Sequence, residues 1–402
     1  MTAAAIPATD AEPATPIRQG IRLQSIDVLR GLVIVLMVVD HVREFFHYGA
    51  LHGMDPLDVN TTSPLLYVTR WMTHFCAPTF VFLAGASSWL QLWRGKTPAQ
   101  LSWFLFSRGL WLVILEFTVI NLAWGFQIGL PFLQVIWVIG ASMMLMSLLT
   151  WLPARLILGL GVLIAAGHNA LSGLDGADLG ALTPLWTLLH HPGMVPAGGG
   201  AQMLEIYPLL PWFGIFCLGY GLSFLFVADA AKRDRTFVWL GLAMIAAFLA
   251  LRFANLYGDR PWEPQADALR SVGAFMNVNK YPPSLDYVLA TLGPVLALMP
   301  VWSRMKGPLA EFFLTYGRVP LFAYVLHLFI AHGLEVGLGL ATGQPFHDFQ
   351  GVALDQSGLQ DWGWPIWVVY LVWALTLAIL YPLCRWFGRI KRERRDWWLS
   401  YL

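Results

Sequence analysis

The amino-acid sequence predicts an all-α, polytopic integral membrane protein. Of its 402 residues, 57% are hydrophobic and only 12% are charged, about half the charged share of a typical soluble domain. The apolar residues also gather in runs long enough to cross about 30 Å of hydrocarbon. These runs are expected to be helices, because a backbone in hydrocarbon has to satisfy its own hydrogen bonds.

Ten such runs follow one another along the chain. They lie near residues 26–47, 65–93, 101–122, 129–152, 155–172, 204–228, 236–256, 282–303, 318–340 and 363–387. We therefore expect a helical bundle of about ten transmembrane helices, forming one domain over residues 21–390. Residues 1–20 are rich in Ala and Pro and are expected to be a disordered cytoplasmic segment. Residues 391–402 are expected to form a basic and aromatic cytoplasmic tail.

The distribution of basic residues predicts the orientation. If the N-terminus is cytoplasmic, 19 of the 25 Lys and Arg residues lie on that side, as the positive-inside rule requires. Both termini are then cytoplasmic, and we expect the bacterial cytoplasmic (inner) membrane as the location. Two longer loops, near 173–203 and 257–281, lie on the outer side, where a substrate entrance or merely a variable surface would form. No basic patch outside the membrane margins indicates nucleic-acid binding.

Three cysteines and five tryptophans have simple structural interpretations. Cys76, Cys217 and Cys384 fall in or next to apolar runs, without a CxxC pair or a metal-ligand spacing, so we expect buried thiols and no metal. An aromatic belt at the membrane interface explains the tryptophans, which are Trp362, Trp364, Trp367, Trp397 and Trp398.

The first span is unusually rich in ionisable residues. Each costs about 2.5–3.5 kcal/mol at membrane depth, so each is a functional candidate. They are Asp27, Arg30, Asp40, His41, Arg43 and Glu44. Eleven residues at 100° per residue bring Arg30 and His41 to within about 20° on one helix face, roughly 16 Å apart. This shared face predicts a polar track that leads from the membrane edge to the buried imidazole of His41. The alternative is that these polar residues only pack against neighbouring helices.

His41 is the strongest candidate for chemistry, as a general base or a nucleophile; a structural, hydrogen-bonded histidine is the alternative. Glu44, one turn later, or Glu116 of the third span is expected to orient its ring. Asp40 points about 100° away from His41 and is expected to pair with Arg43. Arg30 lies near the inner boundary, where it would bind phosphate or extend to the interface.

Other spans contribute further ionisable residues. Arg70 and His74 are four residues apart and share a face near the outer boundary, where they would receive a polar or anionic acceptor. Glu116 is central, so it has to be protonated or paired. His327 and His332 are five residues apart and do not share a face, with Glu335 between them in angle, which is not a metal-binding spacing. A site built from His, carboxylate and Arg side chains inside a helical bundle favours acyl transfer as the reaction.

Six segments carry a resemblance to a known family. They read RLQSIDVLRGLVIVLMVVDHVREFF (22–46), TRWMTHFCAPTFVFLAG (69–85), YPLLPWFG (207–214), NVNKYPPSL (277–285), GRVPLFAYVLHL (317–328) and RRDWWLSYL (394–402). With these segments the chain resembles, over nearly its whole length, the heparan-alpha-glucosaminide N-acetyltransferase-like family of bacterial membrane proteins. The wider transmembrane acyltransferase superfamily uses cytoplasmic acetyl-CoA to acetylate a sugar across the membrane.

The resemblance implies roles for particular residues. Arg and His separated by ten residues on the first span are similar to Arg30 and His41 here, which implies that His41 carries catalysis and that Arg30 positions acyl-CoA. In the lysosomal enzyme the catalytic His lies in the loop after the first span, where no His of this chain aligns. His47, His52 and His74 therefore stand beside His41 as candidates.

The sequence thus predicts a membrane acyltransferase that moves acetyl from acetyl-CoA, a co-substrate rather than a tightly bound cofactor, to a hydroxyl or amine of an extracytoplasmic glycan. The candidate residues are His41, Glu44 and Asp40 for catalysis, Arg30 and Asp27 for donor binding, and Arg70, His74, Glu116 and Lys280 for substrate binding, with Arg70 and Lys280 also suited to oxyanion stabilisation. The segment GRVPLFAYVLH is similar to one in the lysosomal enzyme, and this resemblance adds Tyr324 and His327 to the substrate-binding candidates. Expected partners are acyl-CoA, the glycan and the bilayer, with a homodimer left open and no nucleic acid. The alternatives are a transporter or flippase with a proton relay, and a non-catalytic subunit of a glycan-assembly complex.

Overall fold

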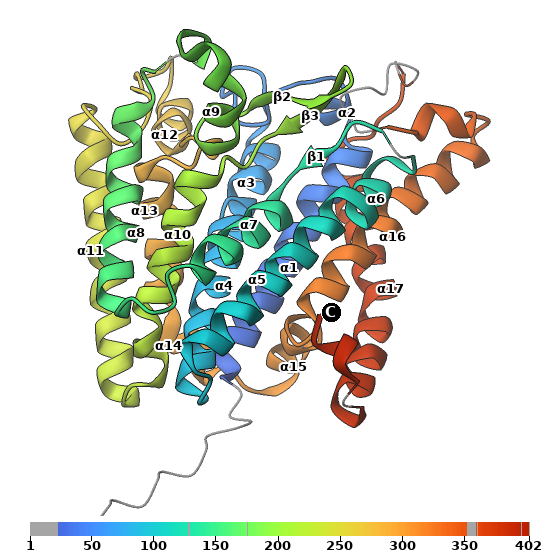
Figure 1. Ribbon diagram of the computed structural model, residues 1–402. Helices are drawn as coiled ribbons and strands as arrows, with labels where there is room; N and C mark the ends of the chain where they lie inside the picture. The colour runs from blue at the N-terminus through green and yellow to red at the C-terminus, as the bar shows by residue number, and fades with distance from the viewer. Residues whose placement is uncertain are drawn as a thin grey trace, which may run out of the picture.

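The computed structural model is a bundle of long helices with a small sheet at one end (Figure 1). It describes residues 23–127, 129–174, 176–351, 359, 361–394 and 396–401. The predicted disordered segment, residues 1–20, lies outside the described residues. The long helices run roughly side by side, and α1 begins at the same end of the bundle at which α17 finishes. The sheet and the short helices α9 and α12 lie at the opposite end.

The chain forms seventeen α-helices within the described residues. They are α1 (Gln24–Phe46), α2 (Tyr48–Leu51), α3 (Pro64–Thr73), α4 (Cys76–Trp93), α5 (Pro98–Leu115), α6 (Asn121–Gly125), α7 (Val135–Ser147), α8 (Ala154–Gly167), α9 (Thr183–Leu189), α10 (Leu209–Leu222), α11 (Ala230–Ala254), α12 (Ala268–Met276), α13 (Leu285–Ala297), α14 (Met299–Arg304), α15 (Gly307–Gly317), α16 (Pro320–Ala341) and α17 (Ile366–Glu393). Short 3-10 and π segments extend several of them, namely η1 (Glu116–Ile120), η2 (His168–Leu171), η3 (Gly176–Leu182), η4 (Ser223–Val227), η5 (Phe346–Phe349) and η7 (Trp397–Tyr401).

The helices confirm an all-α, polytopic membrane fold. Eight described segments are long and apolar enough to cross a membrane: Pro64–Trp93, Pro98–Gly125, Ala154–Leu171, Leu209–Val227, Ala230–Ala254, Leu285–Arg304, Pro320–Ala341 and Ile366–Glu393. The two other predicted spans coincide with α1 and α7. Helix α7 has only 13 residues. Helix α1 has 23 residues, but its five charged residues lie towards both of its ends and leave no 18-residue stretch with two charges or fewer.

Helix α1 avoids lipid because other helices surround it. It packs against α3, α4, α15, α16 and α17, and most of its residues are buried. Its charged side chains therefore meet protein and the pockets between elements, where ion pairs, hydrogen bonds and water can satisfy them. The five charged residues of α1 are for this reason accommodated inside the bundle.

One end of the bundle contains a sheet, whereas the sequence predicts no strand. A three-stranded sheet has the order β1-β3-β2, in which β1 (Phe132–Leu133) is parallel to β3 (Ala201–Glu205) and β2 (Gly193–Gly198) is antiparallel to it. The predicted loop 173–203 thus contains α9 and a hairpin, and the loop 257–281 contains α12. Trp362, assigned to the interfacial belt, is instead buried against Phe349.

Glycine pairs set two of the helix crossings. A Cβ on Gly31 of α1 would lie 1.8 Å from the Phe313 carbonyl oxygen of α15, and one on Gly317 would lie 1.8 Å from the Asp27 carbonyl oxygen. Helices α4 and α10 cross in the same reciprocal way through Gly85 and Gly219. Only glycine permits backbones this close, so these positions fix α1 and α4 against their neighbours.

Candidate functional site

Helix α1 presents its polar residues at three successive levels. Asp27 and Arg30 lie near its start, His41 lies in its last third, and Asp40, Arg43 and Glu44 lie around and beyond His41. The first level lines one pocket and Arg43 and Glu44 line a second. The two pockets share no lining residue among those described. His41 lines neither of them and lies on α1 between Arg30, which lines the first, and Arg43, which lines the second.

The first pocket, which we call the basic pocket, has a volume of about 670 Å³. Six basic side chains and one acidic side chain line it: Arg30, Arg94, Lys96, Arg108, Arg318 and Lys391, with Asp27. The Arg30 guanidinium donates a hydrogen bond to Ser87 and lies 3.4 Å from the Asp27 carboxylate. An apolar wall of α5, α7 and α16 residues completes the pocket, and Tyr324 also lines it. A basic opening with an apolar wall suits a polyanionic ligand that carries an uncharged arm.

The surroundings of His41 consist of aromatic rings and a second histidine. The ring of His41 meets Trp124 of α6 and Tyr324 of α16 edge-on, at 5.1 and 6.2 Å between ring centres. Its Nδ1 lies 2.7 Å from Nε2 of His327. The prediction that Glu44 or Glu116 orients this ring is wrong, because Glu44 pairs with Arg43 and Glu116 accepts the Trp137 backbone N–H.

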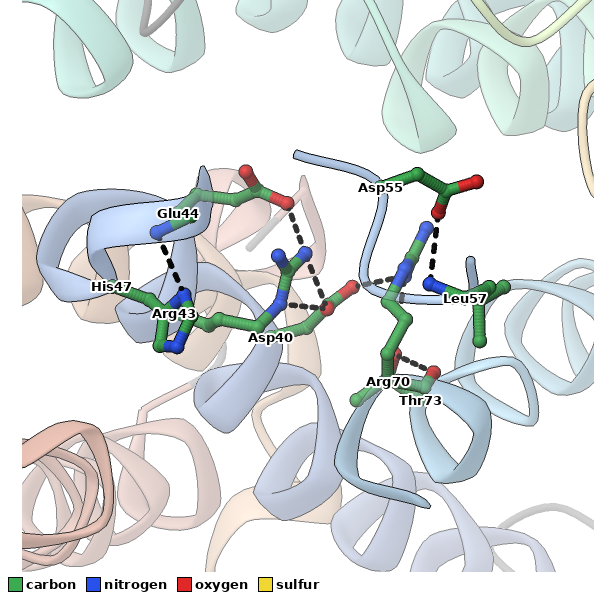
Figure 2. Close-up of polar contacts among 9 residues, drawn as sticks. Asp40, Arg43, Glu44, His47, Asp55, Leu57, Arg70 and Thr73 are labelled. Atoms are coloured by element: carbon green, nitrogen blue, oxygen red, sulfur yellow. Dashed lines mark hydrogen bonds and ion pairs between the residues drawn. The ribbon is translucent and has the colours of Figure 1, made fainter. Parts of the chain in front are cut away.

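Asp40 binds two arginines at once (Figure 2). Its carboxylate lies 3.2 Å from Nη2 of Arg43 on the same helix and 2.8 Å from Nη1 of Arg70 on α3. The predicted Asp40–Arg43 ion pair is thus confirmed and extended to a second helix. Glu44 accepts a hydrogen bond from the same Nη2 of Arg43. This network ties α1 to α3 directly beside His41.

The second pocket, which we call the loop pocket, has a volume of about 650 Å³ and lies between the loops around residues 54–60 and 259–265. Arg70, His74, Lys280 and Tyr281 belong to its lining, together with Arg43 and Glu44. His74 is 1% exposed and its Nδ1 has no hydrogen-bond partner among the described residues. The polar lining of the loop pocket, which also includes Trp262, suits a small, hydroxyl-rich molecule.

Lys280 and Tyr281 form the most unusual electrostatic feature of this lining. Lys280 is 7% exposed, and its Nζ lies 4.9 Å from the Tyr281 ring centre and 5.8 Å from that of Tyr207. Burial raises the pKa of the Tyr281 hydroxyl, but Lys280 and Arg70 outweigh this effect and leave the pKa below its ordinary value. Tyr281 is therefore a strong hydrogen-bond donor, and sequence reasoning did not select it.

Glu116 has a structural role at the start of α7. The π segment η1 begins at this residue, and its Oε2 accepts the backbone N–H of Trp137 at 2.7 Å. Asn121 donates to the Glu116 carbonyl and accepts from the Phe132 backbone N–H, which ties η1 to β1. Glu116 has no cation within 4 Å among the described residues, and its Oε1 has no hydrogen-bond partner there.

The structure therefore sorts the candidates into groups. Asp27 and Arg30 lie in the basic pocket, which Tyr324 joins to His41 and His327; Arg70, His74 and Lys280 lie in the loop pocket. His41, His47, His52 and His327 are not among the residues that line either pocket, but His41 and His327 contact Tyr324, which lines the basic pocket. The sequence alone interprets the basic residues that join Arg30 as orientation signals, although Arg94 and Lys96 in one predicted turn and Arg108 two turns into the next span form a local basic group.

Fold and site together define a polytopic helical membrane protein in which one helix, α1, contributes to two polar pockets and carries a partly buried histidine, His41. The family model described as heparan-alpha-glucosaminide N-acetyltransferase, catalytic, matches residues 22–253. The chain belongs to this family, as its resemblance implied. The match includes α1 with Arg30 and His41, whereas Lys280, Tyr281, Tyr324 and His327 lie beyond it. A search of curated proteins finds no match.

Proposed function

We propose that the protein transfers an acetyl group from acetyl-CoA, bound in the basic pocket, to a hydroxyl or amine of a glycan bound in the loop pocket. Membership of an acetyltransferase family supports the reaction class. The observation that carries the rest is the position of His41, which Tyr324 links to the basic pocket and Asp40 links to the loop pocket.

In this proposal the basic pocket holds the nucleotide end of the donor. Its six basic side chains meet the phosphates, and the apolar wall guides the pantetheine arm towards Tyr324. The basic pocket opens to the cytoplasm and the loop pocket to the outside of the bacterial inner membrane, in agreement with the positive-inside rule.

The chemical step is a direct acyl transfer with His41 as the base. Nε2 of His41 takes the proton from the acceptor O–H or N–H, and the acceptor atom forms a bond to the thioester carbonyl carbon. The C–S bond then breaks, and the leaving thiolate takes the proton from His41 to give free CoA. Tyr281, Lys280 and Arg70 would stabilise the negative charge that develops on the carbonyl oxygen.

The test measures radiolabelled acetyl-CoA with purified protein in lipid nanodiscs. Wild type should bind acetyl-CoA, hydrolyse it slowly, and acetylate amino sugars such as glucosamine. His41→Ala should lower turnover by about 10²-fold or more, because it removes the base. Arg30→Ala should weaken acetyl-CoA binding about tenfold or more, through the loss of a charge-assisted contact.

Two controls make the result specific. His52→Ala changes a histidine that lines neither pocket, and Lys232→Ala removes a basic residue from the far side of the bundle on α11. Both should leave binding and turnover unchanged. A wild-type protein that neither binds nor consumes acetyl-CoA would overturn the proposal and favour a transporter, which substrate flux into proteoliposomes would then reveal.

A further inference from the structure

A chain of hydrogen bonds leads from a backbone carbonyl to His41. Nδ1 of His327 lies 3.1 Å from the carbonyl oxygen of Ala323, one turn earlier on α16. A carbonyl oxygen can only accept, so Nδ1 of His327 carries a proton. His327 is fully buried and forms no ion pair with the described residues. Its uncharged form is therefore favoured, with a bare Nε2 that can only accept.

The contact between the two histidines has the geometry of a well-aligned hydrogen bond. The ring planes differ by only 17°, and the ring centres are 4.9 Å apart. This separation exceeds the 2.7 Å between Nδ1 of His41 and Nε2 of His327 by about two ring radii. Both nitrogens thus lie close to the line that joins the ring centres, and the rings meet edge to edge rather than face to face.

The direction of this hydrogen bond follows from the two preceding points. Since Nε2 of His327 has only a lone pair, Nδ1 of His41 is the donor and carries the proton. His41 is then the tautomer whose Nε2 is unprotonated. No hydrogen bond among the described residues occupies that atom, and the His41 side chain is only partly buried.

We infer that His327 is a positioning residue, which fixes His41 in the tautomer that leaves Nε2 as the basic atom. The inference rests on the proposed function, in which this atom takes the acceptor's proton. A histidine and a carbonyl thus do the orienting that a carboxylate performs in other sites. Asp40 is unavailable for this task because Arg43 and Arg70 occupy its carboxylate.

The kinetic test compares two substitutions at His327 with a matched control. His327→Ala should lower kcat by about 10²-fold with KM for acetyl-CoA within about twofold, since His41 then prefers the wrong tautomer. His327→Gln should recover at least tenfold of that loss, because its amide oxygen can accept from Nδ1 of His41. The control, His332→Gln, changes an equally buried histidine of α16 whose ring packs on Phe45 and Phe126. It should keep wild-type kcat per folded molecule.

A spectroscopic measurement makes the inference independent of activity. In ¹⁵N-histidine-labelled protein, with the His41 signals identified by their loss in His41→Asn, wild type should show a protonated Nδ1 and a bare Nε2. His327→Ala should shift His41 towards the opposite tautomer. A protonated Nε2 in wild type, or unchanged kcat in His327→Ala, would overturn the inference. If the predicted tautomer is found but no acetyl is transferred, the proposed function fails while the hydrogen-bond chain stands.

Discussion

Asp40 shows how a single residue can connect two helices inside a membrane protein. Its pairing with Arg43 is visible in the sequence as a spacing of three residues, whereas its bond to Arg70 joins residues 30 positions apart and depends on how α1 and α3 pack. Removing one partner of such a buried network usually lowers the free energy of unfolding by more than the ion pair contributes to it, because the remaining charge is left buried and unpaired.

Glu205 allows a test of how burial of one carboxyl group makes stability depend on pH. It lies at the end of β3, is fully buried, and its Oε2 has no hydrogen-bond partner among the described residues. Burial raises its pKa to about 9. The unfolded chain ionises this carboxyl above its ordinary value of 4.5, while the folded protein keeps it protonated. Stability should therefore fall as pH rises from 4.5 towards 9, by roughly 1.4 kcal/mol per pH unit from this group.

Glu205→Gln should remove this slope, because the amide does not ionise. Thermal unfolding in detergent, followed from pH 5 to 9, should show the variant close to wild type at pH 5 and more stable than wild type at pH 8. Glu263→Gln alters an exposed carboxylate and should behave like wild type throughout. An equal pH slope in wild type and Glu205→Gln would show that this carboxyl ionises in the folded protein.

Among the elements, the reciprocal glycine crossings are the most demanding contacts. Gly85→Ala would bring its Cβ to 2.0 Å from the Phe216 carbonyl oxygen, and Gly219→Ala to 1.9 Å from that of Phe82. Both obstacles are backbone atoms that cannot rotate away, so α4 and α10 would have to separate. We expect each substitution to destabilise the protein by about 1–3 kcal/mol or more.

The measurement is the unfolding temperature of purified protein together with its yield in the membrane. Gly333→Ala and Gly337→Ala are the matched controls, because no atom lies within 4 Å of a Cβ at these positions of α16. They should be neutral or slightly stabilising, since Ala favours a helix. Unchanged unfolding temperatures in Gly85→Ala and Gly219→Ala would mean that the helices cross less closely than described.

The elements also show what the sequence could and could not predict. Every predicted span coincides with a helix, because hydrophobic length is a local property. The sheet was missed because β1 pairs with β3 across about seventy residues, as in Phe132 with Leu204. The π segment at Glu116 was missed for a related reason, since the Trp137 backbone that meets its carboxylate belongs to another helix.

Contacts between residues far apart in the sequence also explain why the site was only partly predicted. The spacing of Arg30 and His41 predicts a polar track along α1, and the structure places Arg30 in the basic pocket and His41 next to Tyr324, which lines the same pocket. The ring partner His327 is 286 residues away in the sequence, so only tertiary packing could show that it, rather than a carboxylate, contacts His41.

The proposal that the two pockets open on opposite sides of the membrane can be tested in intact cells. Asn60→Cys places a thiol in the loop pocket, and Ala99→Cys places one at the exposed start of α5, at the other end of the bundle. A membrane-impermeant maleimide should label Asn60→Cys directly and Ala99→Cys only after permeabilisation. The native cysteines are buried, so unmodified protein gives the background. The reverse pattern would invert the predicted orientation.

The separation of the two pockets has a bioenergetic consequence. No described residue lines both, and His41 lies on α1 between the residues that line one and those that line the other. In the reaction as proposed, the acceptor's proton moves from the outer side to the CoA sulfur at the inner side. The acetyl group moves the opposite way and leaves its bonding electron pair on that sulfur, so it carries one formal positive charge outward. The two charges balance and each turnover is electroneutral. The membrane potential, worth about 2.3 kcal/mol per charge at 100 mV, therefore neither drives nor opposes acetyl transfer.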